Sequence, residues 1–278
     1  MRKNILLLGL ISLILCACGT NQKISTPINQ EIQQEIFRGE KQFFVFETRD
    51  GVTQKIFIEK YTKDPKGIVL LFSGGDGKLD LTLFANKSGR SNFVIRTRDY
   101  FLDNGYMTVM VDAPSDHSDE SGMTGGFRFS NAHALDVNRI IEYLEVYKKP
   151  IWLMGTSRGT ESVAYLATKL NNKIAGIILT SSITVDTRKG SSILSLPLET
   201  ITKPVLITAH KDDQCFVTPA SNTMAIKNAL KNSIQVESKI YENGESKNNN
   251  PCKALTYHGY YEMEKEILTD ILNFIGKN

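Results

Sequence analysis

A serine between two glycines is the strongest chemical signal in the sequence. Gly155-Thr156-Ser157-Arg158-Gly159 follows the apolar run Ile151–Met154 and precedes a helical pattern that extends to about Leu170. This order predicts a strand, a sharp turn and a helix, with Ser157 at the apex. The glycines are needed because a Cβ atom at either position would collide with the neighbouring strand or helix. The Ser157 hydroxyl would then project as a nucleophile, and the Arg158 N–H would point into the same space.

The alternative for this segment is an ordinary glycine-rich β–α turn that binds phosphate. The Gly-x-Gly-x-x-Gly and lysine signatures of such turns are missing here. A serine hydroxyl is a poor nucleophile by itself. A histidine must take its proton, and a carboxylate must hold the imidazole in the required tautomer and stabilise its charged form.

Candidates for the acid and for the histidine lie at the ends of later strands. Asp212 and Asp213 follow the apolar strand Pro204–Ala209, and His258 follows the last predicted strand. In open α/β sheets, ligands bind outside the carboxyl ends of the parallel strands. These side chains are therefore expected to meet Ser157 at one edge of the sheet, and either aspartate satisfies the pattern.

The other histidines are weaker candidates for the base. His210 lies beside the two acids at its own strand end and cannot easily turn back towards the elbow, and His117 precedes the elbow in the sequence. His133 and Asp136 begin a predicted helix, where surface and capping roles are expected for them. His258 is therefore the predicted base, and the alternative is that it is a surface residue.

A glycine-rich loop follows an earlier apolar strand. The run Lys66–Phe72 ends at Ser73-Gly74-Gly75-Asp76-Gly77. Glycines let a backbone approach a substrate closely, and N–H groups there stabilise the negative charge of a tetrahedral intermediate. By position, the Gly75 N–H is predicted to form an oxyanion hole together with the Arg158 N–H. An ordinary glycine-rich turn is the alternative.

These residues require a sheet whose strands end at a common edge. Continuous apolar runs, typical of strands buried on both faces of a parallel sheet, alternate with helical patterns. An antiparallel hairpin that turns at Asp50-Gly51 is expected to begin the sheet. The sequence thus predicts an α/β fold with a mostly parallel central sheet and helices on both faces. The predicted strands are 41–48, 52–61, 66–72, 106–112, 151–154, 173–180, 204–209 and 233–241, and the predicted helices are 92–104, 131–147, 161–170, 220–230 and 262–274.

Two long connections are expected to shape a pocket at this edge. Ala113–Ser130 is polar and rich in glycine, and loops of this length within a compact domain are usually functional. It is predicted to form one wall of the pocket. Ser181–Thr202 is predicted to form a short lid over an accessible pocket.

The first residues have the pattern of an export signal. Arg2 and Lys3 precede an apolar core, Ile5–Leu15, which is too short to span a bilayer as a stable helix. Leu15-Cys16-Ala17-Cys18 resembles the lipobox of bacterial lipoproteins. The resemblance implies cleavage before Cys18 and attachment of diacylglycerol to its thiol. A plain secretory signal is the alternative.

This pattern predicts a protein that is exported and anchored by lipid to the cell envelope. Gly19 after the lipidated cysteine favours the outer membrane, facing the periplasm, in a cell with two membranes. Polar residues then suggest a flexible tether before the folded domain. The predicted parts are a signal peptide at 1–17, a tether at 18–35 and one domain at 36–278.

Two cysteines remain once the leader is removed and Cys18 carries lipid. Cys215 and Cys252 would then lie in an oxidising compartment, which predicts a disulfide, with two free thiols as the alternative. Two cysteines without suitably placed histidines do not make a zinc site, and no pattern indicates a metal or an organic cofactor. The formal net charge of +3 comes without any basic run typical of nucleic-acid binding.

Three motifs together resemble the α/β-hydrolase superfamily, in particular a group of secreted bacterial hydrolases. The motifs are Gly155–Thr160, Asp213-Gln214-Cys215 and His258-Gly259-Tyr260. They stand in the Ser, Asp, His order of that superfamily, and the resemblance covers about Phe43 to Ile275. It implies serine hydrolase chemistry with Ser157, Asp213 and His258 as the triad, and it favours Asp213 over Asp212.

Lipase-type members of the superfamily carry His-Gly-Gly where this chain has Ser73-Gly74-Gly75, which disfavours a bulky lipid substrate. The resemblance implies serine hydrolase chemistry and names no substrate. The predicted activity is hydrolysis of an ester, thioester or amide of a small to medium substrate through an acyl-enzyme. The alternative is a non-catalytic envelope lipoprotein that uses the fold as a binding module. The presence of all three triad residue types in order favours the enzyme.

Overall fold

The computed structural model describes residues 39–82 and 89–278, which belong to one compact unit, Phe37–Asn278. The predicted signal peptide at 1–17, the lipidated Cys18 and the tether at 18–35 lie outside the described residues and remain predictions, as does a domain start at residue 36. Across the part of the chain that the structure describes, no helix combines the length and the apolarity that a membrane span requires.

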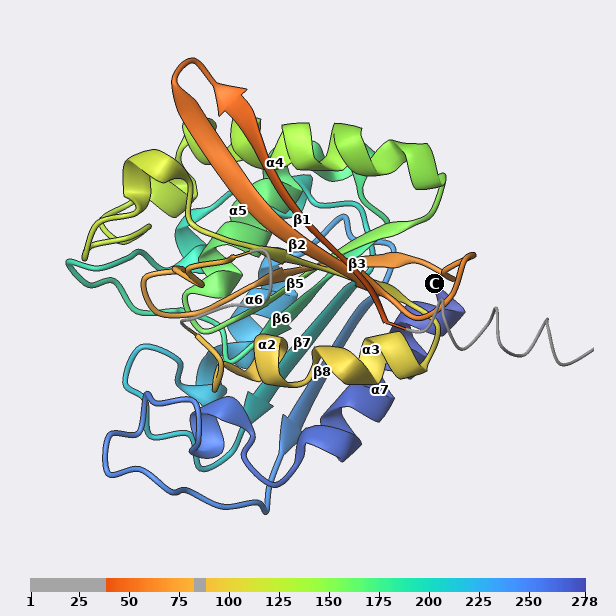
Figure 1. Cartoon of the computed structure of the whole chain (residues 1–278). Helices are drawn as coiled ribbons and strands as arrows, with labels where there is room; N and C mark the ends of the chain where they lie inside the picture. The colour runs from red at the N-terminus through yellow and green to blue at the C-terminus, as the bar shows by residue number, and fades with distance from the viewer. Residues whose placement is uncertain (1–38, 83–88) are drawn as a thin grey trace, which may run out of the picture. The chain divides into compact units, whose positions relative to one another are not determined.

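One eight-stranded sheet forms the centre of this unit (Figure 1). Its strand order is β1-β2-β4-β3-β5-β6-β7-β8. The pairs β1·β2 and β2·β4 are antiparallel, and all other pairs are parallel, as the sequence predicts. The strands are β1 (Glu40–Arg49), β2 (Val52–Lys60), β3 (Ile68–Phe72), β4 (Met107–Val111), β5 (Ile151–Thr156), β6 (Gly176–Thr180), β7 (Val205–His210) and β8 (Val236–Tyr241).

Helices cover both faces of the sheet because the buried strands are apolar on both sides (Figure 1). In β3, Leu70 packs with the helices of one face, and Leu71, its neighbour, packs with those of the other. The first face carries α4 (Asn131–Leu144), α5 (Gly159–Leu170) and α6 (Thr223–Ala229), and the second carries α2 (Phe93–Arg96), α3 (Arg98–Asp103) and α7 (Glu264–Lys277).

The helix predicted at 92–104 is divided into α2 and α3. Thr97 separates the two helices with φ −101° and ψ 3°, which lies outside the helical region. Its hydroxyl donates to the carbonyl of Phe93 at 2.6 Å. Threonine hydroxyls that bond back to the preceding turn bend helices, which accounts for the break.

His133 and Asp136 are buried, so the surface role expected for them is wrong. Asp136 accepts hydrogen bonds from Thr48 at 2.5 Å and from Arg49 Nε at 2.8 Å, which compensates for burying its charge. Burial, reinforced by the charge of Arg128, lowers the pKa of His133 to about 3. The backbone N–H of His133 donates to Ser130 Oγ at 3.1 Å, so Ser130 caps the helix.

The two long connections contain only short 3-10 turns. In the loop after β4 these are Ser115–His117 and Phe127–Phe129, and after β6 they are Ile193–Ser195 and Leu198–Thr200. The connection at 181–202, described without a gap, has no α-helix of its own. It is the short lid that the sequence predicts.

Candidate active site

Ser157 stands at the apex of the turn between β5 and α5, with φ +53°. A positive φ is costly for a residue with a side chain, so the surrounding structure must hold it in place. The two flanking glycines account for this. A Cβ atom at Gly155 would lie 2.4 Å from the carbonyl oxygen of Gly159, and one at Gly159 would lie 2.1 Å from that of Phe72. Strand, turn and helix therefore approach so closely that only glycine fits.

Asp213 and His258 form a buried pair. His258 Nδ1 lies 2.9 Å from Asp213 Oδ2, and the two side chains are 4% and 1% exposed, respectively. The other oxygen, Asp213 Oδ1, accepts the Cys215 N–H at 2.9 Å. Thr218 Oγ1 donates to Asp213 Oδ2 at 2.9 Å and lies 3.1 Å from His258 Nδ1. The carboxylate is thus held on both oxygens while it faces the imidazole.

The competing residues are engaged elsewhere. Asp212 is exposed, and its N–H donates to His210 Nδ1 at 3.0 Å. His210 Nε2 lies 2.7 Å from the carbonyl oxygen of Asn243. His117 Nδ1 lies 2.9 Å from the carbonyl oxygen of Gly122. Of the two aspartates, the structure brings Asp213 to His258.

Ser157 and His258 are linked through the chain that follows β6. The Ser157 N–H donates to the carbonyl of Thr180 at 3.0 Å, and the hydroxyl of Ser181 donates to the carbonyl of His258 at 2.8 Å. His258 Nε2 is buried, and no hydrogen-bond partner exists for it among the described residues. No hydrogen bond therefore joins Ser157 to His258 here. In ligand-free sites such bonds are often long and shorten when substrate binds.

The loop after β3 lies directly against the elbow. A Cβ atom at Gly74 would lie 3.0 Å from Ser157 Cβ, and Gly75 has φ +63°, which favours glycine. Neither the Gly75 N–H nor the Arg158 N–H donates to any acceptor within residues 39–82 and 89–278. Both amides are therefore available to an oxyanion.

Buried charged residues support the loop after β3. Arg128 is 1% exposed and donates to the carbonyl of Ser73 at 3.1 Å and to Ser162 Oγ at 2.7 Å. Glu161 lies between Arg128 and Arg158, with closest N···O distances of 3.9 Å and 3.1 Å. Burial lowers the pKa of Arg128 to about 10 and raises that of Glu161 to about 7, because desolvation disfavours both charges.

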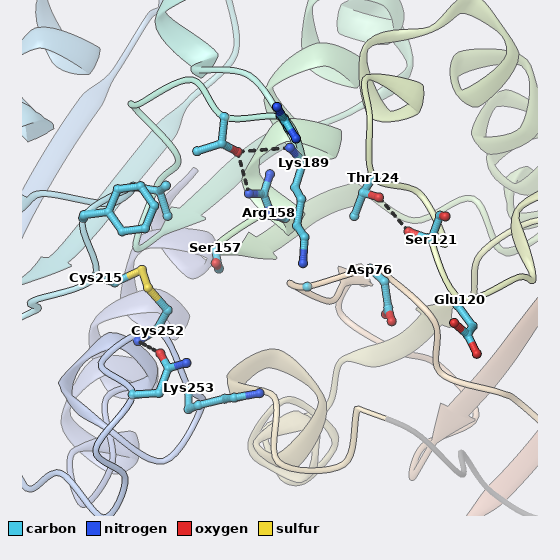
Figure 2. A pocket seen from close by; sticks show the side chains of 16 residues that line it. Asp76, Glu120, Ser121, Thr124, Ser157, Arg158, Lys189, Cys215, Cys252 and Lys253 are labelled. Atoms are coloured by element: carbon cyan, nitrogen blue, oxygen red, sulfur yellow. Dashed lines mark hydrogen bonds between the residues drawn. A yellow bond between two sulfur atoms is a disulfide. The ribbon is translucent and has the colours of Figure 1, made fainter.

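A pocket of about 860 Å³ opens in front of Ser157 (Figure 2). Gly75, Arg158, Cys215 and Cys252 line it together with the serine. Residues of the loop at 113–130 contribute one wall, as expected, and residues of the lid contribute another. These lining residues are Glu120, Ser121 and Thr124 from the loop, and Thr187, Arg188 and Lys189 from the lid.

Cys215 and Cys252 form the predicted disulfide. Close contacts also hold the segment that carries His258. A Cβ atom at Gly259 would lie 1.9 Å from the carbonyl oxygen of Ala254, and the buried Tyr260 hydroxyl accepts the Ser181 N–H at 3.1 Å. These contacts explain why a glycine and a tyrosine follow the histidine.

A group of potential metal ligands consists of Asp213, Cys215 and His258, whose ligand atoms lie within 4.8 Å of one another. The Cys215 sulfur is bonded to Cys252, so it offers no thiolate. The two remaining groups hydrogen-bond to each other, and the donor set does not fit a zinc site.

Sequence reasoning missed Thr218, Arg128 and Glu161. Thr218 lies five residues after Asp213, and its hydroxyl contacts a histidine 40 residues away in the chain. A threonine before a proline carries no signal for such a role. Arg128 is a charged residue in a loop, and only its burial shows that it contacts the loop after β3. The position of Glu161 on the first turn after the elbow is the one signal that marks it as close to the site.

No protein-family model and no curated protein matches the chain. Solved structures do match over most of its length. A cold-adapted esterase from an Arctic intertidal metagenomic library is similar with TM-score 0.60 and 15% identity, covering 84% of this chain and 93% of that chain. A Pyrococcus furiosus esterase is similar with TM-score 0.65 and 13% identity, covering 87% and 93%.

An acylaminoacyl peptidase from Pyrococcus horikoshii is also similar, with TM-score 0.61 and 13% identity, covering 89% of this chain and 43% of that chain. The likeness lies in the arrangement of the elements. In this chain the architecture consists of one eight-stranded sheet, antiparallel at one end, with helices on both faces. The chain has the α/β-hydrolase fold.

Proposed function

We propose that the protein is a serine hydrolase that cleaves an ester, thioester or amide of a small to medium substrate through an acyl-enzyme. The observation that carries this proposal is the buried Asp213–His258 hydrogen bond, 2.9 Å long, beside the strained elbow of Ser157. The carboxylate fixes the imidazole so that Nδ1 carries the proton, which leaves Nε2 as the base. That nitrogen is buried and has no described partner, so it is available to the serine.

In the proposed reaction, His258 Nε2 takes the proton of Ser157 Oγ while this oxygen attacks the substrate carbonyl. The negative charge that develops on the carbonyl oxygen is accepted by the N–H groups of Gly75 and Arg158. His258 then gives its proton to the leaving group, and the acyl-enzyme remains. Water, deprotonated by the same nitrogen, attacks the acyl carbon and releases the acid and free Ser157.

The comparisons support hydrolysis in general. The similar structures carry the names of esterases and of a peptidase, and both reactions pass through attack on an acyl carbon. The identities of 13% to 15% leave the bond and the acyl group to experiment. Esters are the first substrates to test, because an alkoxide or phenoxide leaves an acyl carbon more readily than an amine does.

A fluorophosphonate probe tests the proposal. The probe phosphorylates an activated serine, so wild-type protein should be labelled and Ser157→Ala should not. Ser195→Ala is the matched control, because Ser195 lies in a 3-10 turn of the lid and does not line the pocket. No labelling of a folded wild-type protein would contradict the proposal and favour a binding module without catalysis.

We also propose that the protein is exported and carries lipid on Cys18, from the lipobox-like Leu15-Cys16-Ala17-Cys18. This places it on the cell envelope, at the outer membrane facing the periplasm in a cell with two membranes. Palmitate labelling should be lost in Cys18→Ser and kept in Cys16→Ser, which is the matched control. Labelling that persists in Cys18→Ser would refute lipidation at this residue.

A further inference from the structure

Several cationic side chains line the pocket in front of Ser157. They come from three separate segments: the elbow, the lid and the loop after β8. Four lining residues are cationic and only two are acidic. The cationic residues are Arg158, Arg188, Lys189 and Lys253, and the acidic residues are Asp76 and Glu120.

The two signs of charge occupy different parts of the pocket. Figure 2 shows Lys189 and Lys253 reaching into the pocket from opposite walls on the side of Ser157. Asp76 and Glu120 lie towards the other end. A substrate that extends from Ser157 across the pocket would therefore pass the lysines before it reaches the carboxylates.

Most of these positive charges have no carboxylate partner among the described residues. Arg158 pairs with Glu161 at 3.1 Å and donates to Thr187 at 3.0 Å. Arg188, Lys189 and Lys253 form no ion pair with any carboxylate in the described ranges, 39–82 and 89–278. Charges of one sign around a concave surface focus the electrostatic potential and attract ligands of the opposite sign.

Part of the pocket wall is apolar. Phe216 is 70% exposed and lines the pocket together with Val217 and the disulfide. An exposed phenylalanine gives a hydrocarbon chain a surface to cover. The pocket thus combines an apolar wall with an opening rimmed by cations.

We propose that the pocket selects esters whose acyl or leaving group carries an anionic group, such as a carboxylate, a few bonds away from the reacting carbonyl. The anion binds between Lys189 and Lys253, with Arg188 adding to the field, and apolar parts of the substrate pack on Phe216. This inference rests on the proposed hydrolase function. It extends that proposal by specifying that the substrate carries a negative charge.

Two matched pairs of esters test the inference. In the first pair, p-nitrophenyl hydrogen adipate carries a carboxylate on the acyl side, and its methyl ester does not. In the second, 4-carboxyphenyl acetate carries it on the leaving-group side, and 4-(methoxycarbonyl)phenyl acetate does not. We expect the anionic member of at least one pair to have the higher kcat/KM. The preference should weaken in 1 M salt, where the Debye length falls to about 3 Å.

Substitutions then assign the preference to these side chains. Lys189→Gln and Lys253→Gln should each lower the anionic-to-neutral ratio of kcat/KM by about 2- to 5-fold, and the triple variant with Arg188→Gln should lower it further. Lys231→Gln changes the net charge equally at an exposed residue outside the pocket, so it should keep the wild-type ratio. Ratios serve as the readout because they cancel effects common to both esters.

Each outcome decides the question. Equal rates within both pairs, a preference for the neutral esters, or a preference that survives the triple variant would overturn the inference and leave the hydrolase proposal standing. Absence of turnover for all four esters, together with absent fluorophosphonate labelling, would remove the hydrolase proposal and the inference with it. A preference lost in the variants and in salt would establish the anionic substrate class.

Discussion

Cys215 is joined by a disulfide to Cys252, and the bond ties the loop that carries Asp213 to the loop that carries His258. The Cys215 N–H also donates to Asp213 Oδ1 at 2.9 Å. Cys215 therefore holds both the disulfide and the Asp213 carboxylate. The bridge spans 37 residues of the chain, a loop that in the entropy model constrains the unfolded state by about 4 kcal/mol.

Reduction of this disulfide is expected to lower activity before the fold melts. Release of the two loops lets His258 move, and an error of about 1 Å in its position can cost about 100-fold in rate. Activity and near-UV circular dichroism should be followed together across a titration with reductant. The variant with both Cys215→Ser and Cys252→Ser serves as the control, because its activity should be insensitive to reductant. Native, active protein in which both thiols are counted as free would contradict the prediction.

Asp213→Asn should reduce kcat by about 10³- to 10⁴-fold. An amide at this position stabilises the wrong imidazole tautomer and cannot balance its positive charge. Asp212→Asn is the matched control, since Asp212 is exposed and contacts His210 through its backbone only. Steady-state kinetics on a p-nitrophenyl ester measure both. Equal losses in the two variants would exclude Asp213 as the specific partner of His258.

Thr218→Val should reduce kcat by about 10-fold and leave KM nearly unchanged. The substitution removes the hydroxyl that donates to Asp213 Oδ2 at 2.9 Å and leaves that oxygen with the imidazole alone. Thr218→Ser retains the hydroxyl and should restore most of the rate. If Thr218→Ser is as slow as Thr218→Val, the methyl group and not the hydrogen bond matters at this position.

Glu161→Gln should flatten the dependence of stability on pH between about 4.5 and 7. Burial raises the pKa of Glu161 to about 7 from its ordinary value of 4.5. The unfolded carboxyl group loses its proton near the lower value and the folded one near the upper value. The folded state therefore binds more protons in this window, and its stability falls as the pH rises through it. Urea unfolding at a series of pH values measures the slope.

Glu199→Gln is the control for this experiment, because Glu199 is exposed in the lid. It should keep the wild-type slope. A Glu161→Gln variant with an unchanged slope would show that the carboxylate stays ionised below pH 7, paired with Arg128 and Arg158.

Arg128→Met should lower the free energy of unfolding by about 3–5 kcal/mol and should also slow catalysis. It leaves the charge of Glu161 without one of its buried partners and removes the hydrogen bond to the carbonyl of Ser73. Double substitution with Glu161→Gln should recover part of the stability and little of the rate, because the loop stays unsupported. Chemical denaturation and kcat separate the two effects. Full recovery of the rate in the double variant would mean that the loop does not depend on Arg128.

The sheet and the elbow could be predicted because their signals are local. Continuous apolar runs identify the strands, and Gly155 and Gly159 mark the turn at Ser157, since packing there excludes every other residue. Asp50-Gly51 likewise marks the hairpin, and Gly51 has the positive φ that such turns require. In each case a few consecutive residues determine the backbone.

Contacts between distant segments could not be predicted in the same way. Thr97 breaks a helix through a hydrogen bond that competes with a strong apolar pattern. Arg128 and Glu161 find each other across 33 positions of the chain, and neither residue type is usually buried. The position of His133 at the start of a helix does not predict burial. The preceding loop packs over this residue and shields it from solvent.

The close packing around Ser157 also bears on how this lineage can evolve. No side chain fits at Gly155 or Gly159. Substitutions there would disrupt the elbow, so selection removes them before a new activity can arise. The side chains of Arg188, Lys189 and Lys253 are exposed and form no ion pair with a carboxylate among the described residues, so the fold tolerates other side chains there. Descendants of this protein should therefore diverge at the rim of the pocket, while Ser157 stays where the backbone puts it.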